Sequence, residues 1–208
     1  MTSAASPLKE TPAPEPSEEA AARAHIYSLL GTLLATPPDA ALLDRLKGID
    51  APDTGAAGLA PGWAALKQAA QQTTPEALAE EYQDLFIGLG RGEIVPYGSW
   101  YLTGLLMGEP LVELRGELAA IGLRRQDEVA EPEDHAAALC ESMAFIILAE
   151  DPGVAGRQQA FFERYLQPWM GRFFEDLGKA QSARFYASVA LFGARFIDIE
   201  TTYLSMPV

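Results

Sequence analysis

A histidine that directly follows carboxylates is the most distinctive chemical feature of the sequence. Residues 131–135 read Glu-Pro-Glu-Asp-His, immediately before an apolar stretch with helical spacing. Acidic residues at a helix start complement the helix dipole, which accounts for Glu133 and Asp134. A charged His135 would gain nothing at this positive helix end. Its pKa can therefore be lowered, and the neutral ring can act as a hydrogen-bond partner.

Hydrolysis is one chemistry that Asp134 and His135 could serve, but it needs a nucleophile or a metal ion. Cys140 lies on the apolar stripe that follows and is typical of a small core residue. Ser142 has no evident base beside it, and the sequence contains no G-x-S-x-G motif. We therefore predict no catalytic residue, and a hydrolase using Asp134 and His135 stays as the alternative.

Metal and cofactor binding have little support in the residue counts. Zinc needs about four convergent ligands, whereas the chain has two histidines and one cysteine. The glycine-rich run 88–92 could suggest a phosphate loop, but a helical pattern precedes it and Pro96 follows it. We predict no metal and no cofactor, and we interpret the run as a connector.

A second segment, residues 96–102, reads Pro-Tyr-Gly-Ser-Trp-Tyr-Leu. Three aromatic side chains in a stretch broken by glycine and proline are costly to leave in water. They either plug the core or form the wall of a groove, and composition leaves both alternatives open. If they only fill the core, the chain could be an inert assembly subunit.

The charge balance bears on the choice of partner. The net charge is −14 and the isoelectric point is about 4.5, which disfavours nucleic acids and anionic membranes and favours basic peptides. Solubility alone would also explain this charge. No apolar run approaches the roughly 18 residues of a spanning helix, no secretory signal is evident, and the single cysteine excludes an internal disulfide. These features predict a cytoplasmic protein without membrane insertion.

The elements that must position these segments are all helical by pattern. Residues 1–16 contain four prolines and predict a disordered tail, whereas 17–208 predict one helical domain. Ser17 and the Thr74-Pro75 pair are typical helix starts. The final helix, with apolar residues from Phe185 to Tyr203 spaced four and three apart, predicts a continuous buried seam that includes Ile199. The fold is expected to be an all-α, single-domain helical bundle.

Several blocks of sequence occur in the order typical of one family. They are residues 82–88 (Tyr-Gln-Asp-Leu-Phe-Ile-Gly), 96–102, 110–115 (Pro-Leu-Val-Glu-Leu-Arg), 131–135, 165–169 (Tyr-Leu-Gln-Pro-Trp) and 185–186 (Phe-Tyr). Together they resemble the TorD/DmsD/NarJ family of redox-enzyme maturation chaperones, whose E-P-x-D-H motif is matched at every fixed position. The likeness extends over residues 18–204. The loop 88–95 departs from it, because some members carry additional Trp and Pro there.

The resemblance implies a TorD-like helical bundle and a chaperone function. The partners would be the twin-arginine signal peptide and the apo catalytic subunit of a molybdenum-cofactor oxidoreductase, whose cofactor insertion the chaperone assists before export. Some members form dimers by helix exchange, and weak nucleotide binding has been suggested for the family. The client enzyme stays open. The implied peptide-binding residues are Phe86, Pro96, Tyr97, Ser99, Trp100, Glu131, Pro132, Asp134 and His135.

Overall fold

The structure, a computed structural model, describes residues 16–49, 58–126 and 130–206. Within these ranges it contains eleven α-helices, one short π-helix and no β-strand. This confirms the predicted all-α fold. The predicted tail, residues 1–16, lies outside the described residues except for Pro16, and the single-domain assignment of 17–208 stays a prediction.

The helices differ widely in length, and the two longest stand near the two ends of the chain. In order they are α1 (Glu18–Ala35), α2 (Ala40–Lys47), α3 (Ala60–Gln71), α4 (Pro75–Tyr82), the π-helix η1 (Gln83–Ile87), α5 (Gly98–Thr103), α6 (Glu109–Ala120), α7 (Ala136–Leu148), α8 (Pro152–Ala155), α9 (Gln158–Tyr165), α10 (Met170–Lys179) and α11 (Phe185–Leu204).

Side-chain caps start three of these helices, and two of the caps, Ser17 and Thr74, stand where the sequence analysis predicts a helix start. The Ser17 hydroxyl accepts the Ala20 N–H at 3.1 Å, and the Thr74 hydroxyl accepts the Ala77 N–H at 3.3 Å. An Asp39 carboxylate oxygen accepts a backbone N–H of α2 at 2.7 Å. Each cap satisfies a donor that has no partner inside its own helix, so these polar residues fix the helix boundaries.

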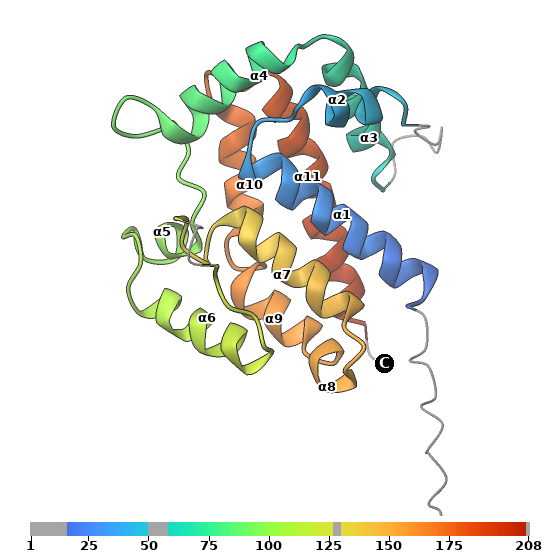
Figure 1. Cartoon of the computed structure of the whole chain (residues 1–208), viewed down its shortest axis with the longest axis vertical. Helices are drawn as coiled ribbons and strands as arrows, with labels where there is room; N and C mark the ends of the chain where they lie inside the picture. Colours follow the sequence, from blue (N-terminus) through green and yellow to red (C-terminus); the bar gives the residue numbers. More distant parts are fainter. Residues whose placement is uncertain (1–15, 50–57, 127–129, 207–208) are drawn as a thin grey trace, which may run out of the picture.

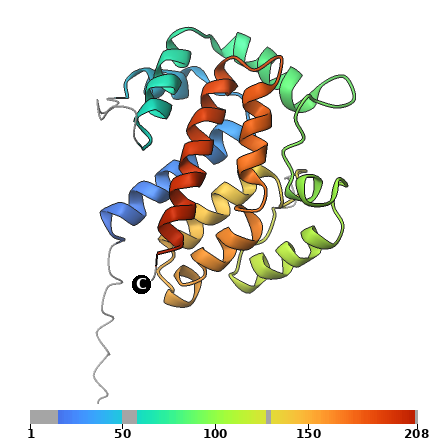
Figure 2. The same cartoon turned by 180° about the vertical axis from the view of Figure 1, so that it is seen from behind.

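Two pairs of antiparallel neighbours make up the centre of the bundle. Helix α1 packs along α7, α10 packs along α11, and α3 lies on α11. Figure 1 shows α1 and α7 in front of α11, and Figure 2 shows the reverse side with α11 in front. Helices α5 and α6 stand at one side, joined to the centre by loops. The site described below lies where these loops meet α7.

The last helix corrects one detail of the sequence prediction. Ile199, expected in the buried seam, is 38% exposed, whereas Glu200 is fully buried. The Glu200 carboxylate accepts hydrogen bonds from Nε and Nη2 of Arg23 at 2.7 and 2.8 Å. An ion pair between α1 and α11 therefore occupies this part of the interface. The apolar spacing alone does not show this, because it contains no information about a partner far away in the chain.

Candidate functional site

The aromatic segment and the acidic-histidine segment lie side by side. The Gly98 N–H donates to the Asp134 carbonyl at 2.9 Å, and the Ala136 N–H donates to the Pro96 carbonyl at 2.8 Å. The residues between these pairs form an isolated antiparallel bridge. The backbone therefore joins two segments that the sequence analysis could only consider separately.

Asp134 serves the structure of this junction rather than a cavity. Its side chain is 4% exposed, and Oδ2 accepts the Ser99 N–H at 2.8 Å, which caps the start of α5. Helix α5 therefore begins at Gly98. Ser99 is buried too, and its hydroxyl accepts the Met107 N–H at 2.9 Å. Both predicted site residues thus hold the α5 loop in place.

His135 is the N-cap of α7. Its Nδ1 accepts the Ala137 N–H at 3.1 Å, and its ring packs edge-on against Tyr97 with the ring centroids 5.1 Å apart. Burial lowers the pKa of His135, although the nearby Glu131 and Asp134 act to raise it. A neutral ring that accepts through Nδ1 carries its proton on Nε2. The residue is therefore a neutral hydrogen-bond partner, as the sequence suggested.

Acidification is expected to destabilise the fold through His135. Below the ordinary histidine pKa of about 6.5, an unfolded chain takes up a proton that the buried ring resists. Stability is then full above about pH 6.5 and falls as the pH drops toward the lowered folded-state pKa. The variant His135→Asn keeps a capping acceptor and removes this titration. Thermal melts between about pH 8 and 5 should show a smaller loss for this variant than for the wild type; equal losses would contradict the assignment.

A cavity of about 510 Å³ opens beside this junction. It is lined by Ala35, Tyr82, Phe86, Ile87, Pro96, Tyr97, Leu118, Leu123, Arg124, Arg125, Gln126, Glu131, Glu133, His135, Ala137, Ala138, Glu141, Ser142 and Phe145. We call it the upper cavity. Five of the nine predicted site residues line it, namely Phe86, Pro96, Tyr97, Glu131 and His135. The other four, Ser99, Trp100, Pro132 and Asp134, do not.

The three aromatic residues of segment 96–102 have three different surroundings. Tyr97 lines the upper cavity, whereas Tyr101 stacks on Trp169, with the ring centroids 5.4 Å apart, and packs against the core. Trp100 is half-buried and lies under the guanidinium of Arg91, 4.4 Å from the ring centroid. Composition left open whether these aromatics form a groove wall or fill the core. Tyr97 does the first and Tyr101 the second.

The acidic groups of the upper cavity are mostly engaged. Glu133 accepts Nε of Arg115 at 2.9 Å and also lies 3.9 Å from Nε of Arg125. The Tyr97 hydroxyl donates to a carboxylate oxygen of Glu131, and burial together with this hydrogen bond raises the pKa of the phenol. These contacts attach the loop before α7 to α6 and to the aromatic wall of the cavity.

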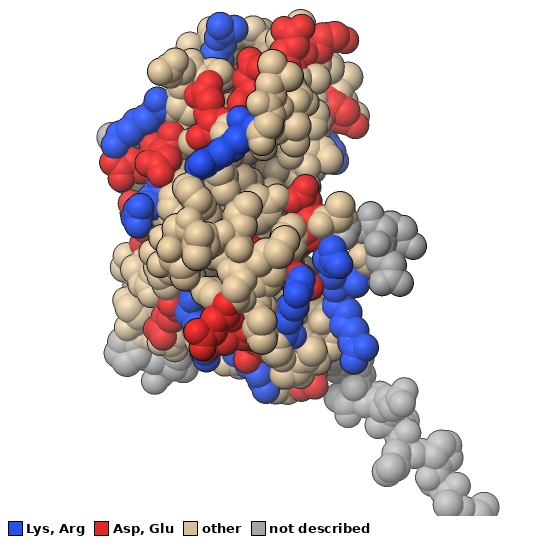
Figure 3. Space-filling view, turned by 90° about the vertical axis from the view of Figure 1, so that its left-hand side faces the viewer, with Lys and Arg blue, Asp and Glu red and all other residues tan. Residues whose placement is uncertain are grey.

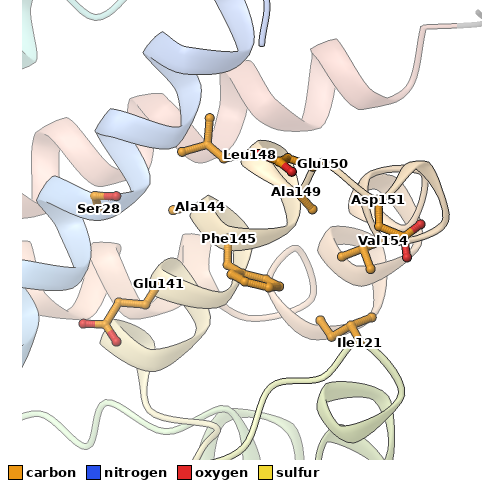
Figure 4. A pocket seen from close by; sticks show the side chains of 10 residues that line it. All are labelled: Ser28, Ile121, Glu141, Ala144, Phe145, Leu148, Ala149, Glu150, Asp151 and Val154. Atoms are coloured by element: carbon orange, nitrogen blue, oxygen red, sulfur yellow. The ribbon is translucent and has the colours of Figure 1, made fainter. Parts of the chain in front are cut away.

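A second cavity, of about 720 Å³, continues along α7, and we call it the lower cavity (Figure 4). It is lined by Ser28, Ile121, Glu141, Ala144, Phe145, Leu148, Ala149, Glu150, Asp151 and Val154. Glu141 and Phe145 line both cavities. The sequence analysis missed this part of the groove. The sequence does contain a pattern that could have indicated it. Glu141, Phe145 and Leu148 are four and three residues apart, so they share a second face of α7 beside the buried stripe.

Neither a metal site nor a membrane span is found in the described part of the chain. No group of three or more His, Cys, Asp or Glu side chains is placed to hold an ion in ranges 16–49, 58–126 and 130–206. Among the same residues, no helix is both long and apolar enough to cross a bilayer. Cys140 is fully buried, and burial raises the pKa of its thiol.

Fold and site together define an all-helical protein with an apolar groove beside a histidine-capped helix. Residues 53–175 match the family described as nitrate reductase delta subunit, and the chain belongs to this family. It is 28% identical over 137 residues to the chaperone protein TorD of Vibrio vulnificus, covering 61% of this chain and 64% of that protein. It is 29% identical over 130 residues to TorD of Vibrio cholerae, covering 58% and 59%. The match thus spans less than two-thirds of these relatives.

A solved structure supports the same fold. A redox enzyme maturation protein from Archaeoglobus fulgidus superposes with a TM-score of 0.54 and 22% identity, over 85% of this chain and 93% of that one. This likeness concerns the helical architecture. The two named Vibrio relatives are both described as chaperone proteins.

Proposed function

We propose that this protein is a cytoplasmic chaperone of a molybdenum-cofactor oxidoreductase. It binds the twin-arginine signal peptide and the apo catalytic subunit, and it assists cofactor insertion before export. The observation that carries the proposal is the groove along α7, whose lower cavity combines apolar walls with carboxylates and so suits a peptide with basic and apolar parts. The named TorD relatives support the same function. Dimerisation by helix exchange stays a prediction.

Exposed apolar side chains outside the groove offer a surface for the body of the client. Leu105, Leu106 and Met107, in the connection between α5 and α6, are 71%, 54% and 55% exposed. Figure 3 shows this side of the molecule, where uncharged groups cover the middle of the face and charged groups of both signs flank it. Contiguous exposed apolar groups commonly mark interaction sites, which suits a protein that holds an unfinished enzyme.

The alternative, a hydrolase using Asp134 and His135, finds no support in the geometry. Both side chains accept backbone N–H groups and act as caps for α5 and α7. The nucleophiles considered in the sequence analysis are unsuited, because the Ser142 hydroxyl donates to the Ala138 carbonyl at 2.8 Å and Cys140 is fully buried. The proposed function therefore involves binding and not bond cleavage.

Substitution of Ile87 tests the upper cavity as a peptide site. This side chain lines the cavity and is 50% exposed, so Ile87→Ser should leave the fold intact. A bound peptide would cover this side chain, and the variant loses part of that apolar contact. Binding of a twin-arginine signal peptide should therefore weaken by about 1–2 kcal/mol, roughly five- to thirtyfold in calorimetric titration. The matched control is Leu89→Ser, fully exposed and outside the cavity. Equal affinities for both variants and the wild type would remove the upper cavity from the site.

A further inference from the structure

The two cavities form one groove with a single carboxylate at its centre. Glu141 and Phe145 line both cavities, so the groove follows one face of α7 past these residues. Figure 4 shows the Phe145 ring lying between α7 and the loop that carries Ile121, with Glu141 one turn nearer the start of the helix. From Glu141 to Leu148 the helix rises about 10 Å, the length of about three extended residues.

The side chain of Glu141 forms no hydrogen bond or ion pair with any residue in the described part of the chain, and burial is the only influence on its pKa. The other carboxylates of the upper cavity differ, since Glu133 is held by Arg115 and Glu131 by Tyr97. Glu141 as a whole residue is exposed to solvent. The surrounding groove walls still remove part of the water around its carboxylate, and this burial raises its pKa. A partly desolvated carboxylate without a counter-charge is a favourable position for an incoming cation.

Helix α1 is shaped to admit this side chain. A Cβ atom on Gly31 would lie 3.0 Å from Cγ of Glu141, which is tighter than ordinary van der Waals contact. Only a glycine at this position leaves the stem of Glu141 undisturbed against α1. The stem of Glu141 therefore lies against α1, where that helix packs along α7.

The lower cavity has the composition that a basic and apolar segment requires. Its charged lining residues are all acidic, Glu141, Glu150 and Asp151, and its apolar lining includes Phe145 and Leu148. Phe145 and Leu148 are 45% and 42% exposed, so they offer apolar area for a partner to cover. Negative charge beside exposed apolar area excludes an anionic ligand and favours a peptide with a cation next to apolar side chains.

We propose that Glu141 binds an arginine side chain of the signal peptide and that the apolar residues beyond this arginine enter the lower cavity against Phe145 and Leu148. This inference rests on the proposed function and adds the direction in which the peptide lies. The basic part is placed at the junction of the cavities, and the apolar stretch runs toward the end of α7. A guanidinium can form two parallel hydrogen bonds with one carboxylate, which makes this pairing specific for arginine.

A double-mutant cycle between protein and peptide tests the pairing. We expect Glu141→Gln to weaken binding of the signal peptide about tenfold in calorimetric titration. Replacing the arginines of the peptide by neutral citrulline should weaken wild-type binding similarly, and Glu141→Gln should then have no further effect. The matched control is Asp198→Asn, which is exposed on α11 and lines neither cavity; it should leave the affinity unchanged.

The direction of the peptide is tested separately with Leu148→Ser. This variant should bind the complete signal peptide several-fold more weakly than the wild type, and it should bind a peptide that ends directly after the arginine pair as well as the wild type does. Equal losses for both peptides would overturn the direction. If Glu141→Gln and the citrulline peptide lower the affinity independently of each other, the inference is overturned while the proposed function stands. The same holds if a second copy covers the groove in a dimer that the peptide does not dissociate. No binding of the complete peptide by the wild-type chain would overturn the proposed function itself.

Discussion

Replacing Glu200 by alanine is expected to lower the free energy of unfolding by about 3–5 kcal/mol, because it leaves a buried guanidinium without its counter-charge. Arg23 is 7% exposed and Glu200 is fully buried. The guanidinium makes two bonds with the carboxylate and a third, at 2.8 Å, with the side-chain oxygen of Gln158. The ion pair connects α1 with α11, so its loss should weaken the centre of the bundle.

Denaturant unfolding followed by circular dichroism measures this effect. The control is Glu175→Ala, which removes the exposed ion pair between Glu175 and Lys179 within α10. Exposed pairs at this spacing contribute only about 0.3–0.5 kcal/mol. A loss for Glu200→Ala no larger than that of the control would show that the buried pair is not needed for the packing of α1 on α11.

Replacing Glu81 by alanine is expected to lower the free energy of unfolding by about 3 kcal/mol, because hydrogen bonds to a charged group each contribute about 1.5–3 kcal/mol. The Glu81 carboxylate accepts the backbone N–H groups of Arg184, Phe185 and Tyr186 at 2.8–3.1 Å. It therefore caps the first turn of α11 from a position on α4. A negative charge at a helix N-terminus also interacts favourably with the helix dipole.

Hydrogen exchange at these three amides gives a local measure of the cap. In the wild type they should exchange slowly, and in Glu81→Ala they should exchange much faster. The adjacent residue Glu80 is exposed, so Glu80→Ala is the matched control and should change neither exchange nor stability appreciably. Slow exchange in Glu81→Ala would contradict the capping role.

The same cap supports the aromatic wall of the upper cavity. The ring of Tyr186 packs against Phe86, with the ring centroids 5.3 Å apart, and against Tyr82 at 6.0 Å. Both of these residues line the cavity. The hydroxyl of Tyr82 donates to the carbonyl of Ala35 at 2.8 Å, and burial raises the pKa of this phenol to about 12. The wall therefore depends on α1, α4 and α11 together.

Helices and their starts were predictable because their signals are local. Ser17 and Thr74 cap the helices that follow them, and the apolar spacing of α7 and α11 describes most of their buried faces. Glu81 and Glu200 could not be recognised, because their partners lie more than a hundred residues away in the chain. Both carboxylates belong to helices whose apolar pattern gives no reason for a buried charge.

The site was predictable in part for a related reason. The family-like blocks 131–135 and 96–102 directed attention to His135 and to Tyr97, and both line the upper cavity. These blocks could not separate a side chain that faces the cavity from one that bonds the backbone, so Asp134 and Ser99 appeared equivalent to His135. The lower half of the groove was missed because Phe145 and Leu148 appear in the sequence as further apolar residues of a buried helix. The structure leaves them 45% and 42% exposed.

Site-specific photocrosslinking tests the central claim most directly, namely that the groove along α7 holds the signal peptide. A photoreactive benzophenone amino acid is placed at position 145, in the groove, or at position 191, where Leu191 is 40% exposed on α11. Similar exposure at the two positions makes the comparison fair. We predict that the client's signal peptide forms a covalent adduct with the chain labelled at position 145 and not with the chain labelled at position 191. Adduct formation only at position 191, or equally at both, would contradict the claim.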